Sequence, residues 1–123
     1  MALSQLPQVT LLPVPDTVKF SFRMTDEERL AEAQRYQQLL SLICKEAQDC
    51  FLLVLDEACA AVSTGLLPLD DLLSCLDRLN CEVVITGRDP DPQLAERADY
   101  ITSMEAVRHP FTQGVTAREG IEF

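Results

Sequence analysis

Two carboxylates follow a short apolar run in the middle of the chain. In FLLVLDEACAAV, residues 51–62, Asp56 and Glu57 come directly after five apolar residues. A buried parallel strand has this composition, and ligands bind at the carboxyl ends of such strands. An acidic pair placed there is well suited to hold Mg²⁺ beside bound phosphates. The alternative is that the pair only caps the helix that follows.

A second polar group follows the next apolar run, EVVIT, residues 82–86. Thr86, Gly87 and Arg88 stand at its carboxyl end. If the two runs are neighbouring parallel strands, these residues and the acidic pair share one edge of a sheet. An arginine beside carboxylates at that edge suits a metal-bound polyphosphate. Arg88 is equally compatible with a surface turn.

The C-terminal stretch MEAVRHPFTQGVTAREGIEF adds further basic side chains. Arg108, His109 and Arg118 lie in it, and we expect them to join the same edge. Because His109 precedes Pro110, it also fits a packed loop residue without a ligand. No arrangement of serine or cysteine resembles a catalytic triad.

A phosphate-binding loop of the form G-x-x-x-x-G-K-[ST] is absent from these residues. Such a loop uses glycines for close backbone approach and a lysine for the phosphates. None of the four glycines is followed by lysine, and Lys19 and Lys45 stand in other contexts. The sequence therefore supplies the acidic pair without this cradle for a triphosphate.

Hydrophobic periodicity predicts alternating strands and helices. TDEE supplies a capping box, with Thr25 as the N-cap and Glu28 three residues later, for a helix that runs to about Ala47. Its apolar stripe consists of Leu30, Ala33, Tyr36, Leu40, Ile43 and Ala47. Further helices are expected to about Ser63, over 69–79 and over 92–98. Strands are expected over 8–12, 51–55, 82–86 and 100–102, and residues 18–22 suit a half-exposed strand or an extended loop.

The predicted fold class is α/β, a parallel sheet flanked by helices, in a single domain over residues 1–123. From residue 51 to residue 102 strands and helices alternate, which implies parallel strands joined by right-handed crossovers. The strand over 51–55 shows no polar–apolar alternation. We therefore expect both of its faces to be covered.

Composition excludes several classes of function. The formal net charge of −10 argues against general binding to nucleic acids or anionic membranes. The five cysteines form no C-x-x-C pair, which favours buried free thiols in a reducing compartment over a metal cluster. No apolar run has the length of a membrane span, and the N-terminus lacks the features of a signal peptide, so we expect a cytoplasmic protein.

Four segments, read together, closely resemble the P-loop-type ATP:corrinoid adenosyltransferases, the cob(I)yrinic acid a,c-diamide adenosyltransferases. They are LLVLDE, LLPLDDLLSCL, EVVITGRDPDPQLAERADYIT and VRHPFTQGVTAREGIEF. The segment LPQVTLLPVPDTVKFSFRMTDEE is similar to the region that precedes the Walker B strand in that family. The combination of TGR, HPF and A-R-x-G-I-E is the specific part of a resemblance that covers nearly the whole chain.

The resemblance implies a RecA-like P-loop fold and a homodimer. It also implies transfer of the 5′-deoxyadenosyl group of ATP to a Co(I) corrinoid, with release of triphosphate, in cobalamin biosynthesis or salvage. By position, Asp56 and Glu57 match the Walker B acids that serve Mg²⁺ and ATP in that family. Thr86, Gly87 and Arg88 match residues on the phosphate side.

The same resemblance assigns a corrinoid-binding role to two aromatic residues. Phe20 and Phe22 fall near the segment that, in relatives, lies against the lower face of the corrin ring. Taken as residues alone, the two phenylalanines also fit a hydrophobic core.

The sequence departs from the family at its beginning. Family members start with a strand, a glycine-rich loop and a helix, whereas the 123 residues start after them, as a truncated RecA-like fold without the Walker A segment. We expect this polypeptide to be inactive by itself. An expressed fragment, a truncated gene and one half of a split enzyme with a P-loop-bearing partner chain all stay open. So does a non-catalytic remnant that binds a corrinoid or a partner.

Loss of the strand beside 51–55 would leave a backbone edge and apolar side chains open. Open apolar edges invite pairing with another chain. We therefore expect a homo-oligomer, most simply a two-fold dimer, assembled through that side of the sheet or through a strand from the N-terminal segment.

Overall fold

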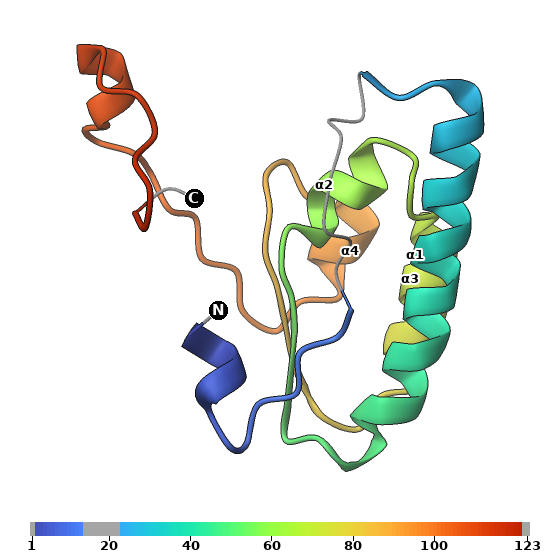
Figure 1. The fold of residues 1–123 in the computed structure, drawn as a ribbon. Coiled ribbons are helices and arrows are strands. Elements are labelled where there is room, and N and C mark those ends of the chain that lie inside the picture. Colours follow the sequence, from blue (N-terminus) through green and yellow to red (C-terminus); the bar gives the residue numbers. More distant parts are fainter. Residues whose placement is uncertain (1, 14–22, 122–123) are drawn as a thin grey trace.

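Helices cover one side of a two-stranded parallel sheet in the computed structural model, which describes residues 2–13 and 23–121. The short 3-10 helix η1 (Ala2–Gln5) comes first, and the helical layer begins with α1 (Asp26–Glu46). Figure 1 shows α1 and α3 side by side along one flank of the molecule.

Helix α1 begins as the sequence predicts. The Thr25 hydroxyl accepts a hydrogen bond from the Glu28 backbone N–H at 3.2 Å, and the Glu28 carboxylate accepts one from the Thr25 N–H at 2.9 Å. This reciprocal pair is a complete capping box. Along the predicted stripe, Leu40, Ile43 and Ala47 are buried, whereas Leu30 at its start is exposed.

The remaining elements alternate as predicted, with slightly shorter bounds. In order they are η3 (Ala47–Asp49), β1 (Leu52–Leu55), α2 (Ala58–Ser63), α3 (Leu69–Leu76), β2 (Glu82–Ile85), α4 (Pro92–Glu96) and η4 (Pro110–Gln113). Strands β1 and β2 are parallel, in a register that pairs Leu52 with Glu82 and Leu55 with Ile85. The β–α–α–β connection between them confirms the α/β class.

The core lies between the helices and one face of the sheet. Its most buried side chains, Leu72 and Cys75, come from α3. Partly buried strand residues Leu53, Leu55 and Ile85 pack against it. Thus alternate residues of β1, and Ile85 of β2, face the core.

The other face of the sheet corrects one prediction. Both faces of residues 51–55 were expected to be covered, but Leu52, Val54 and Val84 are 46%, 55% and 44% exposed. Within the described part of the chain, no element packs over them. We call Leu52, Val54 and Val84 the bare face.

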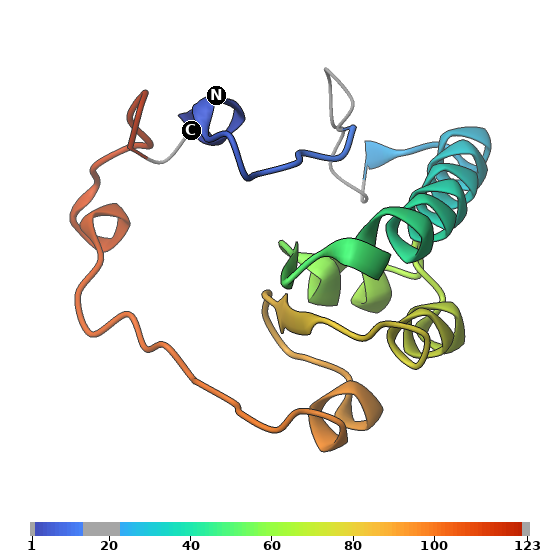
Figure 2. The same cartoon turned by 90° about the horizontal axis from the view of Figure 1, so that it is seen from below.

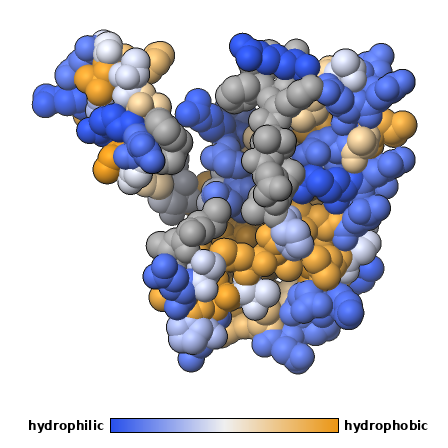
Figure 3. All heavy atoms as spheres, in the orientation of Figure 1, coloured by the Kyte–Doolittle hydropathy of each residue, from blue (hydrophilic) through white to orange (hydrophobic). Residues whose placement is uncertain are grey.

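Figure 3 shows the molecule from the same side as Figure 1, with hydrophobic side chains gathered in the middle and hydrophilic ones along the flank formed by α1.

Two predicted strands do not form. Residues 8–12 are extended without a strand partner, although Leu12 packs against the core. Residues 100–102 are also unpaired, and Tyr100 is 92% exposed. The reason is that a strand exists only through ladder hydrogen bonds, and neither segment lies beside β1 or β2 in the sheet. The strand predicted over 18–22 lies outside the described residues.

The C-terminal stretch leaves the body of the molecule after α4. Figures 1 and 2 show residues from about 100 onward running apart from the sheet, with the N-terminal segment and this stretch on the side of the sheet away from α1 and α3. Among the described residues, no helix has the length and apolar character needed to cross a membrane.

Candidate functional site

A threonine hydroxyl joins the carboxyl ends of the two strands. Thr86 Oγ1 donates a hydrogen bond to Asp56 Oδ1 at 2.7 Å and accepts one from the Glu57 backbone N–H at 2.9 Å. The ladder continues beside it, because the Thr86 N–H donates to the Leu55 carbonyl at 3.1 Å. Thr86 therefore holds the acidic pair at a fixed place on the sheet edge.

Glu57 has a backbone conformation that is uncommon for a residue with a side chain. Its φ and ψ are 55° and 24°, in the left-handed region, and it is the N-cap of α2. Its carboxylate makes no capping hydrogen bond. The structure thus disfavours the capping interpretation of the acidic pair: Glu57 occupies the cap position without using its side chain there, while Asp56 bonds Thr86.

Gly87 is fixed by its contact with α2. Its φ is 141°, and a Cβ added to it would lie 2.6 Å from the Cβ and 3.2 Å from the backbone N of Cys59. Meanwhile the Cys59 N–H donates to the Thr86 carbonyl at 3.3 Å. Only glycine lets the end of β2 approach the start of α2 so closely. Cys59 is a partner that the sequence did not point to, because nothing in the local pattern marks it.

Burial also changes the acidity of that cysteine. Desolvation raises the pKa of the Cys59 thiol, and the Glu57 carboxylate adds to the rise, while a backbone hydrogen bond opposes it. Cys59 therefore serves as a small packing residue beneath the edge, in its protonated form at neutral pH.

Arg88 lies on the exposed turn that follows Gly87. Asp89 in this turn has a φ of 48°, and Asp91 ends it by accepting a hydrogen bond from the Gln93 N–H at 2.9 Å as the N-cap of α4. Among the residues that the structure describes, Arg88 forms no ion pair. Its guanidinium is thus exposed next to the acidic edge, as either interpretation of the sequence allowed.

The basic residues of the C-terminal stretch do not reach this edge. Arg108, His109 and Arg118 were expected there, but they lie in the part of the chain that stands apart from the sheet (Figure 1). His109 is exposed rather than packed, and its Nδ1 accepts a hydrogen bond from the Phe111 N–H at 3.1 Å at the start of η4. None of the described residues after α4 packs against the hydrophobic core, so no such contact brings this stretch to the edge.

The two predicted corrinoid-binding residues cannot be placed. Phe20 and Phe22 lie outside the described residues. Their role stays a prediction.

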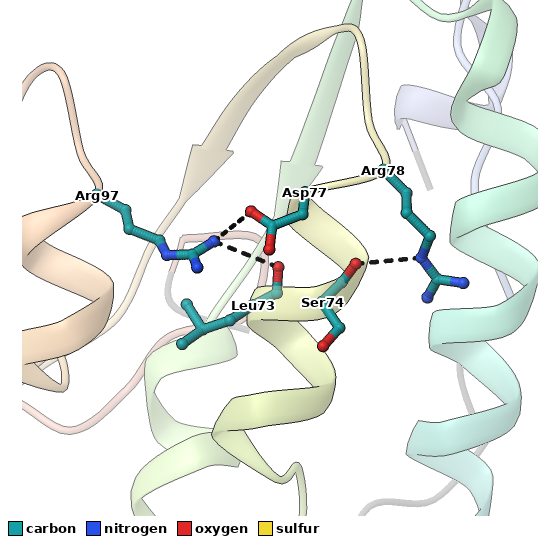
Figure 4. A network of polar contacts seen from close by, with 5 residues as sticks. All are labelled: Leu73, Ser74, Asp77, Arg78 and Arg97. Atoms are coloured by element: carbon teal, nitrogen blue, oxygen red, sulfur yellow. Dashed lines mark hydrogen bonds and ion pairs between the residues drawn. The ribbon is translucent and has the colours of Figure 1, made fainter.

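One polar network between α3 and α4 was not foreseen from the sequence. Arg97, just after α4, donates to the Leu73 carbonyl at 3.4 Å and to Asp77 Oδ1 at 2.5 Å, and so ties α4 to the end of α3 (Figure 4). Arg78 donates to the Ser74 carbonyl at 3.1 Å. Both arginines thereby bind carbonyls in the last turns of α3, where cations are favourable.

The acidic edge offers few ligands to a metal ion. In the described ranges, no three histidine, cysteine, aspartate or glutamate side chains gather. Asp56 and Glu57 supply two adjacent carboxylates. This donor set fits Mg²⁺ better than zinc, because Mg²⁺ is commonly held by one or two carboxylates together with water and substrate phosphates.

The sequence is similar to known proteins over nearly its whole length. The family model of the ATP:corrinoid adenosyltransferase BtuR/CobO/CobP matches residues 2–123. A corrinoid adenosyltransferase of Pseudomonas aeruginosa is 34% identical over 107 residues, which are 85% of this chain and 52% of that protein. The corrinoid adenosyltransferase CobA of Salmonella typhimurium is 34% identical over 74 residues, 58% of this chain and 38% of that protein. The chain thus spans about half or less of the length of these relatives.

Proposed function

This chain belongs to the ATP:corrinoid adenosyltransferase family, and we propose that its strand-end edge serves the nucleotide side of that reaction. The transfer moves the 5′-deoxyadenosyl group of ATP to the reduced cobalt of a corrinoid substrate and releases triphosphate. The observation that carries the proposal is the Thr86 hydroxyl at the end of β2, which bonds Asp56 and Glu57 at the end of the parallel strand β1.

Each residue of the edge has a separate task in this proposal. Asp56 and Glu57 would hold Mg²⁺, which when bound neutralises charge on the triphosphate. Thr86 keeps the Asp56 carboxylate oriented, and Gly87 allows β2 to end close against α2. Arg88 is a positive charge beside the acids, and it would bind phosphate oxygens as these gain charge on departure.

The triphosphate needs more positive contacts than these residues offer. The 123 residues carry a formal charge of −10 and contain no Gly-Lys-Ser/Thr loop. We therefore assign the phosphate-binding loop to polypeptide outside them, whether in the same protein or in a partner chain. The corrinoid would bind near Phe20 and Phe22, as the family resemblance implies, and the proposed location is the cytoplasm.

A second candidate function is a non-catalytic module that binds a partner chain. The bare face favours it, because Leu52, Val54 and Val84 present apolar surface that a partner could cover. The two candidates differ in whether the carboxylates matter. They matter for nucleotide binding, and they are irrelevant to an apolar contact.

The test separates catalysis from folding. The 123-residue chain is assayed anaerobically with chemically reduced cobalamin and Mg-ATP, alone and joined to the part of the Pseudomonas aeruginosa relative that it does not align with. We expect no turnover from the chain alone, because phosphate positioning is missing. We expect turnover and Mg²⁺-dependent ATP binding from the chimera.

Variants of the chimera then test the edge itself. Asp56→Asn and Glu57→Gln should each weaken Mg-ATP binding by about tenfold or more, since each removes a charge from the metal site. Glu96→Gln, an exposed carboxylate on α4, is the matched control and should change nothing. Unchanged ATP affinity in both edge variants would refute the proposed role of the acids. Turnover by the chain alone at the rate of a full-length relative would refute the assignment of the phosphate loop.

A further inference from the structure

Two cysteines from different helices meet inside the helical layer. Cys44 lies near the end of α1 and Cys75 near the end of α3, and their Sγ atoms are 2.7 Å apart. Cys75 is 1% exposed, whereas Cys44 is half-buried. The pair lies in the described core, away from the strand-end edge.

The other cysteines have different surroundings. Cys50 is exposed, with its Sγ 3.5 Å from the Glu46 carbonyl, and Cys59 lies beneath Gly87. Cys81 is half-buried ahead of β2. In the described part of the chain, Cys44 and Cys75 are the two of the five whose sulfurs lie in contact. The contact was not visible in the sequence, since the two residues are 31 positions apart.

We propose that Cys44 and Cys75 are a modification site, a thiol pair that closes reversibly to a disulfide. The oxidant is a hydroperoxide. The Cys44 thiolate attacks its O–O bond, which breaks to give the Cys44 sulfenic acid and a water or alcohol molecule. The Cys75 sulfur then attacks the Cys44 sulfur and expels the hydroxyl group as water, while the Cys75 proton is lost. In sum, two thiols are oxidised, one peroxide is reduced, and each thiol loses one hydrogen.

The order of the two steps follows from the environment of each sulfur. Burial, and then the hydrogen bond with Cys44, raises the pKa of Cys75 to about 12. Because the thiolate is the nucleophile, Cys75 reacts slowly with a dissolved oxidant at neutral pH. Cys44 is half-buried and is thus the sulfur that a small peroxide can reach. Once Cys44 is oxidised, Cys75 is already beside it.

Little movement is needed to form the bond. A disulfide joins its sulfurs at about 2.05 Å, and these two sulfurs already lie in direct contact. The bond would link α1, which leads into β1, to α3, which leads into β2. Oxidation would therefore cross-link α1 and α3, the helices that precede β1 and β2. It would leave the residues of the acidic edge chemically unchanged.

The test uses the whole 123-residue chain and hydrogen peroxide. After mild oxidation the protein is denatured, alkylated with iodoacetamide and weighed by intact mass spectrometry. We expect three of the five cysteines to be alkylated, a peptide map with Cys44 joined to Cys75, and full recovery of five alkylated cysteines after dithiothreitol. We also expect the thermal midpoint of the oxidised chain to rise by about 5–10 °C.

Variants decide which sulfurs take part. Cys44→Ala and Cys75→Ala should each abolish the intramolecular disulfide, and Cys50→Ala, the exposed control, should keep it. If Cys75→Ala fails to fold, the half-buried Cys44→Ala carries the test. Five alkylated cysteines after oxidation, or a bridge that includes Cys50 or Cys81 instead, would overturn the proposal.

Discussion

The two faces of the β1–β2 sheet carry similar residues and have opposite surroundings. On one face Leu53, Leu55 and Ile85 pack against the core beneath α1 and α3. On the bare face Leu52, Val54 and Val84 are close to half exposed. Since hydrophobicity does not distinguish the two sets, the difference lies in what the rest of the described chain places over each face.

This difference shows what an apolar strand pattern reports. An apolar run without polar–apolar alternation is typical of a strand whose two faces are both covered. The described residues cover only one face of this sheet. The aligned region is 52% of the length of the Pseudomonas aeruginosa relative. We infer that the bare face is shaped for polypeptide other than the described residues, and we propose the rest of a longer fold or a second copy of the chain.

The largest expected effect concerns association through the bare face. In isolation the 123-residue chain should form a homodimer, because burying about 800 Å² of apolar surface contributes on the order of 20 kcal/mol before entropic costs. Val54→Glu should shift it to monomer, since a carboxylate would be buried in the contact. Leu30→Glu, at an exposed apolar position on α1, is the control and should leave the dimer intact.

Sedimentation at micromolar concentration measures the oligomeric state of the unmodified chain and of both variants. A chain that sediments as a monomer before any substitution would show that the bare face does not mediate self-association.

The next prediction compares the stability lost when a leucine is truncated in the core and on the bare face. Leu72→Ala should lower the free energy of unfolding by about 2–5 kcal/mol, because it opens a cavity at a side chain that is 0% exposed. Leu52→Ala, the same chemical change on the bare face, should cost under about 1 kcal/mol in the monomer. Urea denaturation of the Val54→Glu background compares the two without dimerisation. Equal losses would mean that the bare face is covered in solution.

The last of the three effects is expected at a strand end. Gly87→Ala should cost about 3 kcal/mol, since a positive φ adds to a clash with Cys59. Gly65→Ala is the control, because its φ of 73° is also positive but nothing lies within 4 Å of the added Cβ. It should cost only about 1 kcal/mol. If thermal or urea unfolding gives the same loss for both, the contact between β2 and α2 is looser than described.

Local signals predicted the parts of the fold that depend on neighbouring residues. The Thr25 capping box, the α/β alternation and the meeting of Asp56 with Thr86 all follow from short patterns. The prediction of a strand over 100–102 was wrong, because three β-prone residues cannot form a strand without a neighbouring strand to pair with. The Gly87–Cys59 and Cys44–Cys75 contacts were invisible because they join residues 28 and 31 positions apart through packing that no pattern encodes.

Those long separations also bear on how the chain folds. The Thr86–Asp56 hydrogen bond joins residues 30 positions apart, and the Cys44–Cys75 contact joins residues 31 apart. Closing a flexible loop of that length has an entropic cost, and the chain bears this cost before the contact between the loop ends stabilises it. The rate-limiting event should therefore be the docking of β2 against β1, whereas the capped α1 can form early from local contacts. A Cys44–Cys75 disulfide retained in the unfolded chain would close that loop in advance and speed refolding.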